Sequence, residues 1–159
     1  MTKPVPDGYH TVTPYLTLRS TADAIAFYAR AFGARETERI PGPDGKSIAH
    51  AEIRIGDSIV MLSDEFPQSG TRSPQSLGGS TASLFLYVPD VDAAFRRAVD
   101  AGATVSMPPT DMFWGDRFCK LADPFGHQWG LATHKEDVPP DEMKRRAAEA
   151  MKQMAGGQK

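Results

Sequence analysis

The same local pattern occurs twice along this chain, and this repetition limits the possible folds more than any other feature of the sequence. Residues 21–34 (TADAIAFYARAFGA) have a counterpart in residues 90–103 (DVDAAFRRAVDAGA). Each segment carries apolar residues at helical spacing, begins beside or at a residue that can cap a helix, and ends in Gly-Ala. Two copies are too few for a solenoid of stacked repeats. The repetition therefore predicts one supersecondary unit that is present twice.

Runs of alternating apolar and polar residues predict strands on both sides of each helix. In the first half the predicted strands are 12–18, 34–40, 46–55 and 58–62, with a tight Gly-Asp turn between the last two. In the second half they are 82–88, 103–107, 117–122 and 127–133. Each half therefore has the order β-α-β-β-β. Because one helix covers only one face of such a sheet, the other face must meet the other half, a partner chain or a ligand.

These elements predict an α+β fold in which two βαβββ modules form a curved, barrel-like mixed sheet, followed by a C-terminal amphipathic helix. We expect a first module over residues 10–65, a linker over 66–81, a second module over 82–134 and a helical tail over 135–159. The linker is rich in Gly, Ser, Pro and Gln and has no periodicity. The tail has Met and Ala on one side, so we expect it to lie on the body or across a dimer partner rather than on a membrane.

The charge balance and the single cysteine argue against several classes of function. The formal net charge is −2 and both signs are scattered along the chain, so no basic region is available for a nucleic-acid backbone. Cys119 is the only cysteine, so no disulfide can form within the chain. No apolar run approaches the roughly 20 residues of a membrane span, and the N-terminus lacks the apolar region of a signal peptide. We expect a cytoplasmic protein with neither a nucleic-acid nor a membrane partner.

The predicted strand 46–55 separates its side chains into an apolar face and a polar face. The apolar face carries Ala49, Ala51, Ile53 and Ile55, and the opposite face carries Ile48, His50, Glu52 and Arg54. The polar row is either a solvated sheet surface or one wall of a pocket. In a pocket, the imidazole of His50 can act as a hydrogen-bond donor, a base or a ligand. We therefore take His50 and Glu52 as candidate ligand-binding or catalytic residues.

The matching segment of the second half combines an aromatic ring with two opposite charges. Trp114 is followed by Asp116 and Arg117, and pockets that orient a ligand commonly mix such groups. The alternative is a turn held by an Asp–Arg pair and a packed Trp. Tyr15 on the first strand and Tyr87 on its counterpart add two further candidates for the pocket wall, or else belong to the core. The sequence contains no P-loop, dinucleotide fingerprint or G-x-S-x-G motif.

Together with the paired helices, two short segments resemble the vicinal-oxygen-chelate superfamily, which includes glyoxalase I, bleomycin-resistance proteins and extradiol dioxygenases. These are the hairpin segment 50–57 (HAEIRIGD) and the turn 123–129 (DPFGHQW). Segments 61–64, 113–117 and 132–138 resemble its PhnB-like branch. The resemblance covers about residues 10–145 and implies a two-module fold, a cavity for a small molecule and a homodimer.

The resemblance also implies where the metal enzymes of this superfamily hold their metal. The corresponding positions in this chain are Thr13, Met61, Ser83 and Gly130. A divalent metal enzyme needs His, Glu or Gln at such positions, so we expect no metal and no other cofactor, which counts against glyoxalase or dioxygenase chemistry. The first hypothesis is therefore a metal-independent small-molecule binder. The second is a lyase or isomerase with His50 or Glu52 as base or ligand, and the third is a structural protein whose cavity is filled by side chains.

Overall fold

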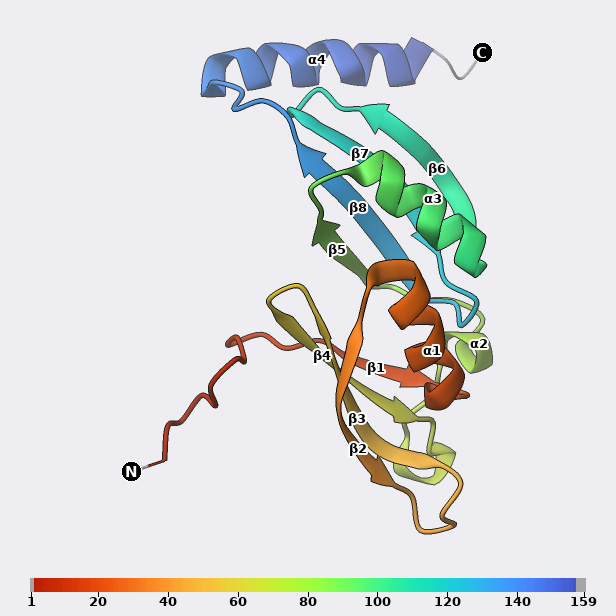
Figure 1. The fold of residues 1–159 in the computed structure, drawn as a ribbon. Coiled ribbons are helices and arrows are strands. Elements are labelled where there is room, and N and C mark those ends of the chain that lie inside the picture. Colours follow the sequence, from red (N-terminus) through yellow and green to blue (C-terminus); the bar gives the residue numbers. More distant parts are fainter. Residues whose placement is uncertain (1, 157–159) are drawn as a thin grey trace.

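The computed structural model describes residues 2–156, and Figure 1 shows two sheets, each with a helix against one face. Module 1 consists of β1 (Tyr15–Leu18), α1 (Thr21–Phe32), β2 (Arg35–Pro41), β3 (Ile48–Ile55) and β4 (Ser58–Asp64). Module 2 consists of β5 (Ser83–Tyr87), α3 (Val91–Ala101), β6 (Thr104–Asp111), β7 (Asp116–Ala122) and β8 (Gln128–His134). Two short helices, η1 (Pro67–Ser69) and α2 (Pro74–Leu77), lie between the modules, and α4 (Pro140–Gly156) follows them.

The two sheets have the same topology, which confirms the predicted duplication. Their strand orders are β1-β4-β3-β2 and β5-β8-β7-β6. In each sheet the first strand pairs in parallel with the last, and the other pairs are antiparallel. The α+β fold with a C-terminal helix is therefore as predicted. The sheets do not close into a barrel, because β1 and β5 are edge strands that form no ladder with each other within residues 2–156.

Local side-chain chemistry fixes both ends of the two module helices. At the start of α1 the hydroxyl of Ser20 accepts a hydrogen bond from the backbone N–H of Asp23, and Asp90 caps α3 through the N–H of Ala93. Each helix ends at a glycine in the left-handed conformation, with φ of 69° at Gly33. The predicted caps and stops are confirmed, and they set the same entry and exit for the chain in both modules.

The largest difference from the predicted strands is at β6, which continues past Met107 to Asp111. This stretch contains Pro108 and Pro109, which lack the N–H that a central strand needs. The sheet tolerates them because, among the strands of the described range 2–156, β6 is an edge strand that pairs with β7 alone, and the register shifts between Met107 and Thr110. The expected linker is also not featureless, since it holds η1 and α2.

The turn that follows β7 joins the two modules. The buried carboxylate of Asp123 accepts hydrogen bonds from the Tyr28 hydroxyl of α1 at 2.7 Å and from the Trp129 indole of β8 at 2.9 Å. It also accepts the backbone N–H groups of Phe125 and His127. Burial and the neighbouring Asp123 raise the pKa of Tyr28 well above its usual value. Together with the packing of α1 against α3, this network makes the two halves one body.

The C-terminal helix α4 does not cover the body with its apolar side. Figure 1 shows it crossing the end of module 2, and Arg146 bonds Glu136 in the segment before it. Met151 and Met154 remain more than half exposed. The alternative of packing on a partner chain stays a prediction. None of the helices within residues 2–156 combines the length and apolar character needed to cross a bilayer.

Candidate functional site

Each sheet has one face covered by its helix and one face that no helix of residues 2–156 covers, which we call the open face. The strand register places four side chains in one row across the open face of module 1, namely Tyr15, Met61, Glu52 and Glu38. The alternate residues of β3, Ala51 and Ile53, are fully buried in the core beneath α1. The predicted division of β3 into an apolar and a polar face is therefore confirmed over residues 50–55, whereas Ile48, expected on the polar face, belongs to the buried core.

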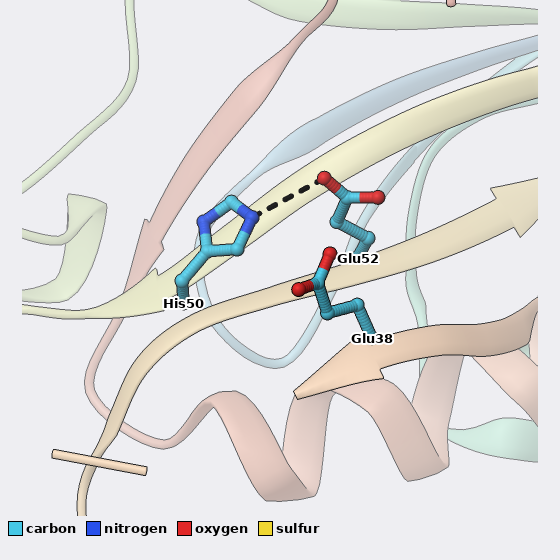
Figure 2. Close-up of side chains that lie close together, drawn as sticks. All are labelled: Glu38, His50 and Glu52. Atoms are coloured by element: carbon cyan, nitrogen blue, oxygen red, sulfur yellow. Dashed lines mark hydrogen bonds and ion pairs between the residues drawn. The ribbon is translucent and has the colours of Figure 1, made fainter. Parts of the chain in front are cut away.

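Five side chains meet on this open face, and we call them the module 1 cluster: Tyr9, Tyr15, Glu38, His50 and Glu52. His50 Nε2 lies 3.3 Å from Glu52 Oε1, and its Nδ1 lies 3.0 Å from the Tyr15 hydroxyl. The Tyr9 hydroxyl donates to the other oxygen of Glu52 at 2.5 Å. Figure 2 shows Glu38 on the neighbouring strand, with its carboxylate turned toward the same space. Donor atoms of Glu38, His50 and Glu52 all lie within 4.8 Å of one another.

A β-bulge brings Glu38 to this position. Glu36 is opposite Ile53, but Glu38 is opposite Glu52, so Thr37 is an extra residue in β2. Without this extra residue, Glu38 would alternate onto the other face of the sheet. The Thr37 hydroxyl donates to the backbone carbonyl of Glu52, which holds the bulge against β3. The sequence alone did not indicate Glu38, since a bulge depends on which strands pair.

The carboxylate of Glu52 is withdrawn from water and, within residues 2–156, forms no ion pair with a Lys or Arg side chain. Glu52 is 6% exposed. Within residues 2–156, His50 is its only ion-pair partner, and Glu38 has none. Its hydrogen bond to Tyr9 is the main cause that raises the pKa of that phenol. A buried charge is normally paired or bound to a metal, so this arrangement needs explanation.

The open face of module 2 is aromatic instead. Phe85 stacks on Phe118 with ring centroids 5.3 Å apart, Tyr87 lies 5.1 Å from Phe85, and Trp114 lies 5.9 Å from Phe118. A hollow of about 340 Å³ adjoins these rings and is lined by Phe85, Phe118 and Lys120 among others. Phe85 and Tyr87 are 47% and 67% exposed. This face therefore presents a row of flat apolar surfaces.

Asp116 holds two of these aromatic side chains in place by hydrogen bonds. Its buried carboxylate accepts hydrogen bonds from the Tyr87 hydroxyl at 3.2 Å and the Trp114 indole at 3.1 Å, and it pairs with His134 Nδ1 at 2.8 Å. His134 Nε2 in turn pairs with Asp137. These two carboxylates raise the pKa of His134. The sequence predicted Tyr87, Trp114 and Asp116 at the site, and the structure does bring them together.

Arg117 does not point toward this group. Its guanidinium binds both oxygens of Asp92 on α3, at 2.7 and 2.9 Å, and also reaches Asp111. Successive strand residues point to opposite faces, so Arg117 faces α3 whereas Asp116 faces the open side. The pairing lowers the pKa of Asp92. The alternative Asp–Arg pair therefore forms, but with Asp92 and Asp111 and not with Asp116. A role for Arg117 in ligand binding stays a prediction.

The predicted site residues thus form two groups, one in each module. Tyr15, His50 and Glu52 belong to the module 1 cluster, and the hydrogen bonds given above do not join them to the aromatic face of module 2. The prediction missed Tyr9 and Glu38. Tyr9 gave no sequence signal, because it lies outside the expected elements and reaches Glu52 only through the fold.

The four positions that the resemblance implies for a metal do not form a metal site. Thr13 donates its hydroxyl to the His10 carbonyl, and Met61 offers only a thioether. A Cβ atom at Gly130 would lie 2.8 Å from the Phe118 ring and 3.0 Å from the Phe85 ring, so aromatic packing occupies the place of a ligand there. The residues present do not fit a divalent ion at these positions.

Comparison with known proteins gives a consistent result. The Glyoxalase/Bleomycin resistance protein/Dioxygenase superfamily profile matches residues 10–131. An uncharacterized protein of Mycobacterium bovis is 47% identical over 135 residues, which cover 83% of this chain and 88% of the relative. The crystal structure of TioX from Micromonospora sp. ML1 has 31% identity and a TM-score of 0.63, covering 79% of this chain and 98% of TioX. The PhnB protein from Bacillus cereus shares the fold, with 18% identity, a TM-score of 0.60, and 78% and 99% coverage.

Proposed function

Since this chain belongs to the Glyoxalase/Bleomycin resistance protein/Dioxygenase superfamily, we propose that it is a small-molecule-binding protein that holds a flat organic ligand against the aromatic open face of module 2. The observation that carries the proposal is the row of four neighbouring rings beside a hollow of about 340 Å³, with Phe85 47% and Tyr87 67% exposed. Contiguous exposed aromatic surface is uncommon on a protein unless it binds something.

The lining of the hollow indicates the chemistry of the ligand. Phe85 is 47% exposed and rests on the buried ring of Phe118, and planar conjugated molecules stack well on such an aromatic surface. Lys120 and Gln128 lie at the same hollow and supply polar donors. A planar molecule with an acceptor oxygen or an acidic group satisfies both features. The ligand class that we propose is therefore a conjugated ring system with such a group at its edge.

A panel of planar acids and natural-product chromophores, screened by thermal shift and then by calorimetry, tests this proposal. Phe85→Ala and Trp114→Ala should each weaken a hit by about 10-fold, which is the value of one lost aromatic contact. Met154→Ala on α4 is the control and should leave the affinity unchanged. Hits that bind both ring variants as tightly as the unaltered protein would exclude this face as the binding site.

We also propose that two copies of the chain associate, with the open faces as the surfaces that a partner shields. The exposed rings of Tyr15, Phe85 and Tyr87 support this proposal, because all three lie on open faces that no helix covers. Light scattering on a sizing column should give twice the mass of one chain. A monomer at micromolar concentration would contradict the proposal.

The second candidate function is a lyase or isomerase step at the module 1 cluster. The observation that favours it is the buried Glu52 carboxylate, bonded to His50 and Tyr9, because a base withdrawn from water suits proton abstraction. If this candidate is right, Glu52→Gln abolishes turnover of a hit while its binding persists. Solvent deuterium incorporation into the ligand, followed by mass spectrometry, separates the two functions.

A further inference from the structure

We propose that Glu38, His50 and Glu52 bind a divalent first-row transition-metal ion on the open face of module 1. This site is distinct from the four positions discussed above, and it goes beyond the proposed binding of an organic ligand. Among residues 2–156, these three form the one group of His, Cys, Asp and Glu side chains whose donor atoms lie within 4.8 Å of one another. They offer one imidazole nitrogen and two carboxylates.

The spacing suits coordination after a small adjustment. Ligands held about 2.1 Å from a tetrahedral ion lie about 3.4 Å from one another. His50 Nε2 and Glu52 Oε1 already lie 3.3 Å apart, and Figure 2 shows Glu38 facing the gap between them. Glu38 is exposed and makes no side-chain hydrogen bond to another residue of the described range 2–156, so its carboxylate can rotate inward. Three protein ligands leave coordination positions for water or a substrate oxygen.

Two tyrosines orient His50 and Glu52 through the atoms that do not face the proposed ion. The Tyr15 hydroxyl contacts His50 Nδ1, which leaves Nε2 directed at the proposed ion. The Tyr9 hydroxyl donates to Glu52 Oε2 and leaves Oε1 directed at the same point. Metal-bound histidines and carboxylates are commonly held in this way by outer hydrogen bonds. Both oxygens of Glu52 and both nitrogens of His50 therefore have a role.

Charge supplies the main reason for an ion at this point. Within residues 2–156, no Lys or Arg side chain forms an ion pair with Glu38 or Glu52, although Glu52 is buried. Other buried carboxylates of this protein are compensated: Asp123 accepts four hydrogen bonds and Asp116 has three partners. A divalent cation would neutralise the two neighbouring carboxylates. The mixed nitrogen and oxygen donors favour zinc, cobalt, nickel, iron or manganese over magnesium or calcium.

His134 provides an internal control for this inference. It also has two carboxylate partners, but Asp116 contacts its Nδ1 and Asp137 contacts its Nε2. The carboxylates thus lie on opposite sides of the ring, and they do not converge with it on one point. Charge and composition alone would make the two histidines equivalent. Geometry distinguishes them, and it assigns the metal to His50.

Titration of the EDTA-treated full chain with cobalt(II), followed by visible absorption, and with zinc(II), followed by calorimetry, tests the site. We expect one ion per chain. His50→Phe should weaken binding by more than about 100-fold, and Tyr15→Phe by about 10-fold. His134→Gln should leave the affinity unchanged. If His50→Phe disturbs the fold, Glu38→Gln serves instead, since Glu38 is exposed and bonds no side chain of residues 2–156. It should weaken binding by at least about 10-fold.

Two outcomes would overturn the proposal. One is a dissociation constant above about 1 mM for both ions, which is too weak for a built site. The other is an affinity that His134→Gln lowers and that Glu38→Gln and His50→Phe leave intact. Trp114→Ala separates this proposal from the proposed function, because it should weaken an organic hit and leave cobalt binding unchanged. Either proposal can therefore fail without the other.

Discussion

The two modules share their strand order and even a β-bulge, yet their open faces carry unlike chemistry. At three positions that the register makes equivalent, module 1 has Glu38, His50 and Glu52, and module 2 has Met107, Phe118 and Lys120. The helix-covered faces have diverged far less. Ile53 corresponds to Leu121 there, and both are fully buried. Packing beneath the helices therefore fixes the backbone of this fold, whereas the open face carries different chemistry in each module.

The β-bulge in the second strand of each module shows most clearly that the backbone is shared and the open-face side chains are not. The register shifts between Glu36 and Glu38 in β2, and between Val105 and Met107 in β6. The device that turns one side chain onto the open face is therefore part of the duplicated unit. Only the residue that it presents differs, a carboxylate in one module and a thioether in the other. A metal site in module 1 needs no backbone feature that module 2 lacks.

The modules form one body, and Asp123→Asn is the substitution expected to disrupt that body most strongly. Each oxygen of Asp123 accepts two hydrogen bonds, so an amide nitrogen must face two donors in either orientation. Because both donors are left unsatisfied, we expect a loss of about 4 kcal/mol in the free energy of unfolding. Chemical denaturation followed by circular dichroism measures it. A loss below about 1 kcal/mol would mean that the network does not hold the modules together.

A matched pair of substitutions sharpens the contrast between the open faces. Asp116→Asn should destabilise the protein by about 1 to 2 kcal/mol, because the carboxylate is satisfied in module 2. Glu52→Gln should instead stabilise the metal-free protein by about 1 kcal/mol. The amide can still accept from Tyr9 and donate to His50, and it removes one of two neighbouring charges. Denaturation in EDTA gives both values. Equal losses of unfolding free energy in the two variants would contradict the proposal that the module 1 cluster is arranged to bind a cation.

A smaller effect is expected beneath the helices, where the modules should behave alike. Cys119 in module 2 is equivalent to Ala51 in module 1, and both are fully buried. Burial raises the pKa of the Cys119 thiol to about 11. The native protein should therefore resist thiol reagents at pH 8, and the unfolded protein should react. Cys119→Ala should cost about 1 kcal/mol and alter neither metal nor ligand binding. A change in ligand affinity would place the thiol at the pocket instead of in the core.

Local sequence signals were sufficient to predict the helices and the two faces of β3 over residues 50–55. Helix caps and the alternation of apolar and polar residues depend on only a few neighbouring residues. They could have separated Arg117 from Asp116 as well, since neighbours in a strand cannot share a face. The place of Glu38 on the open face could not be predicted from the sequence, for a different reason. Its position depends on a bulge, and a bulge is defined only once β2 is paired with β3. Finding Glu38 beside His50 and Glu52, as the proposed metal ligands, therefore required the fold. Placing His50 and Glu52 on one face of a strand required only the sequence.

The smallest effect concerns pH and distinguishes the histidines of the two faces. Asp116 and Asp137 raise the pKa of His134 above its ordinary value of 6.5. Protonated His134 therefore favours the folded state, and its contribution is complete below pH 6.5 and is lost as the pH rises through the raised pKa. The stability difference between the unaltered protein and His134→Gln should be largest at pH 5.5 and vanish by pH 9. The effect is small because the ring is half exposed and water screens its charge. Thermal melts across this pH range measure the stability difference. A difference that grows with pH would show that His134 is neutral in the folded protein. In that case no imidazolium pairs with Asp116 at the end of the aromatic face.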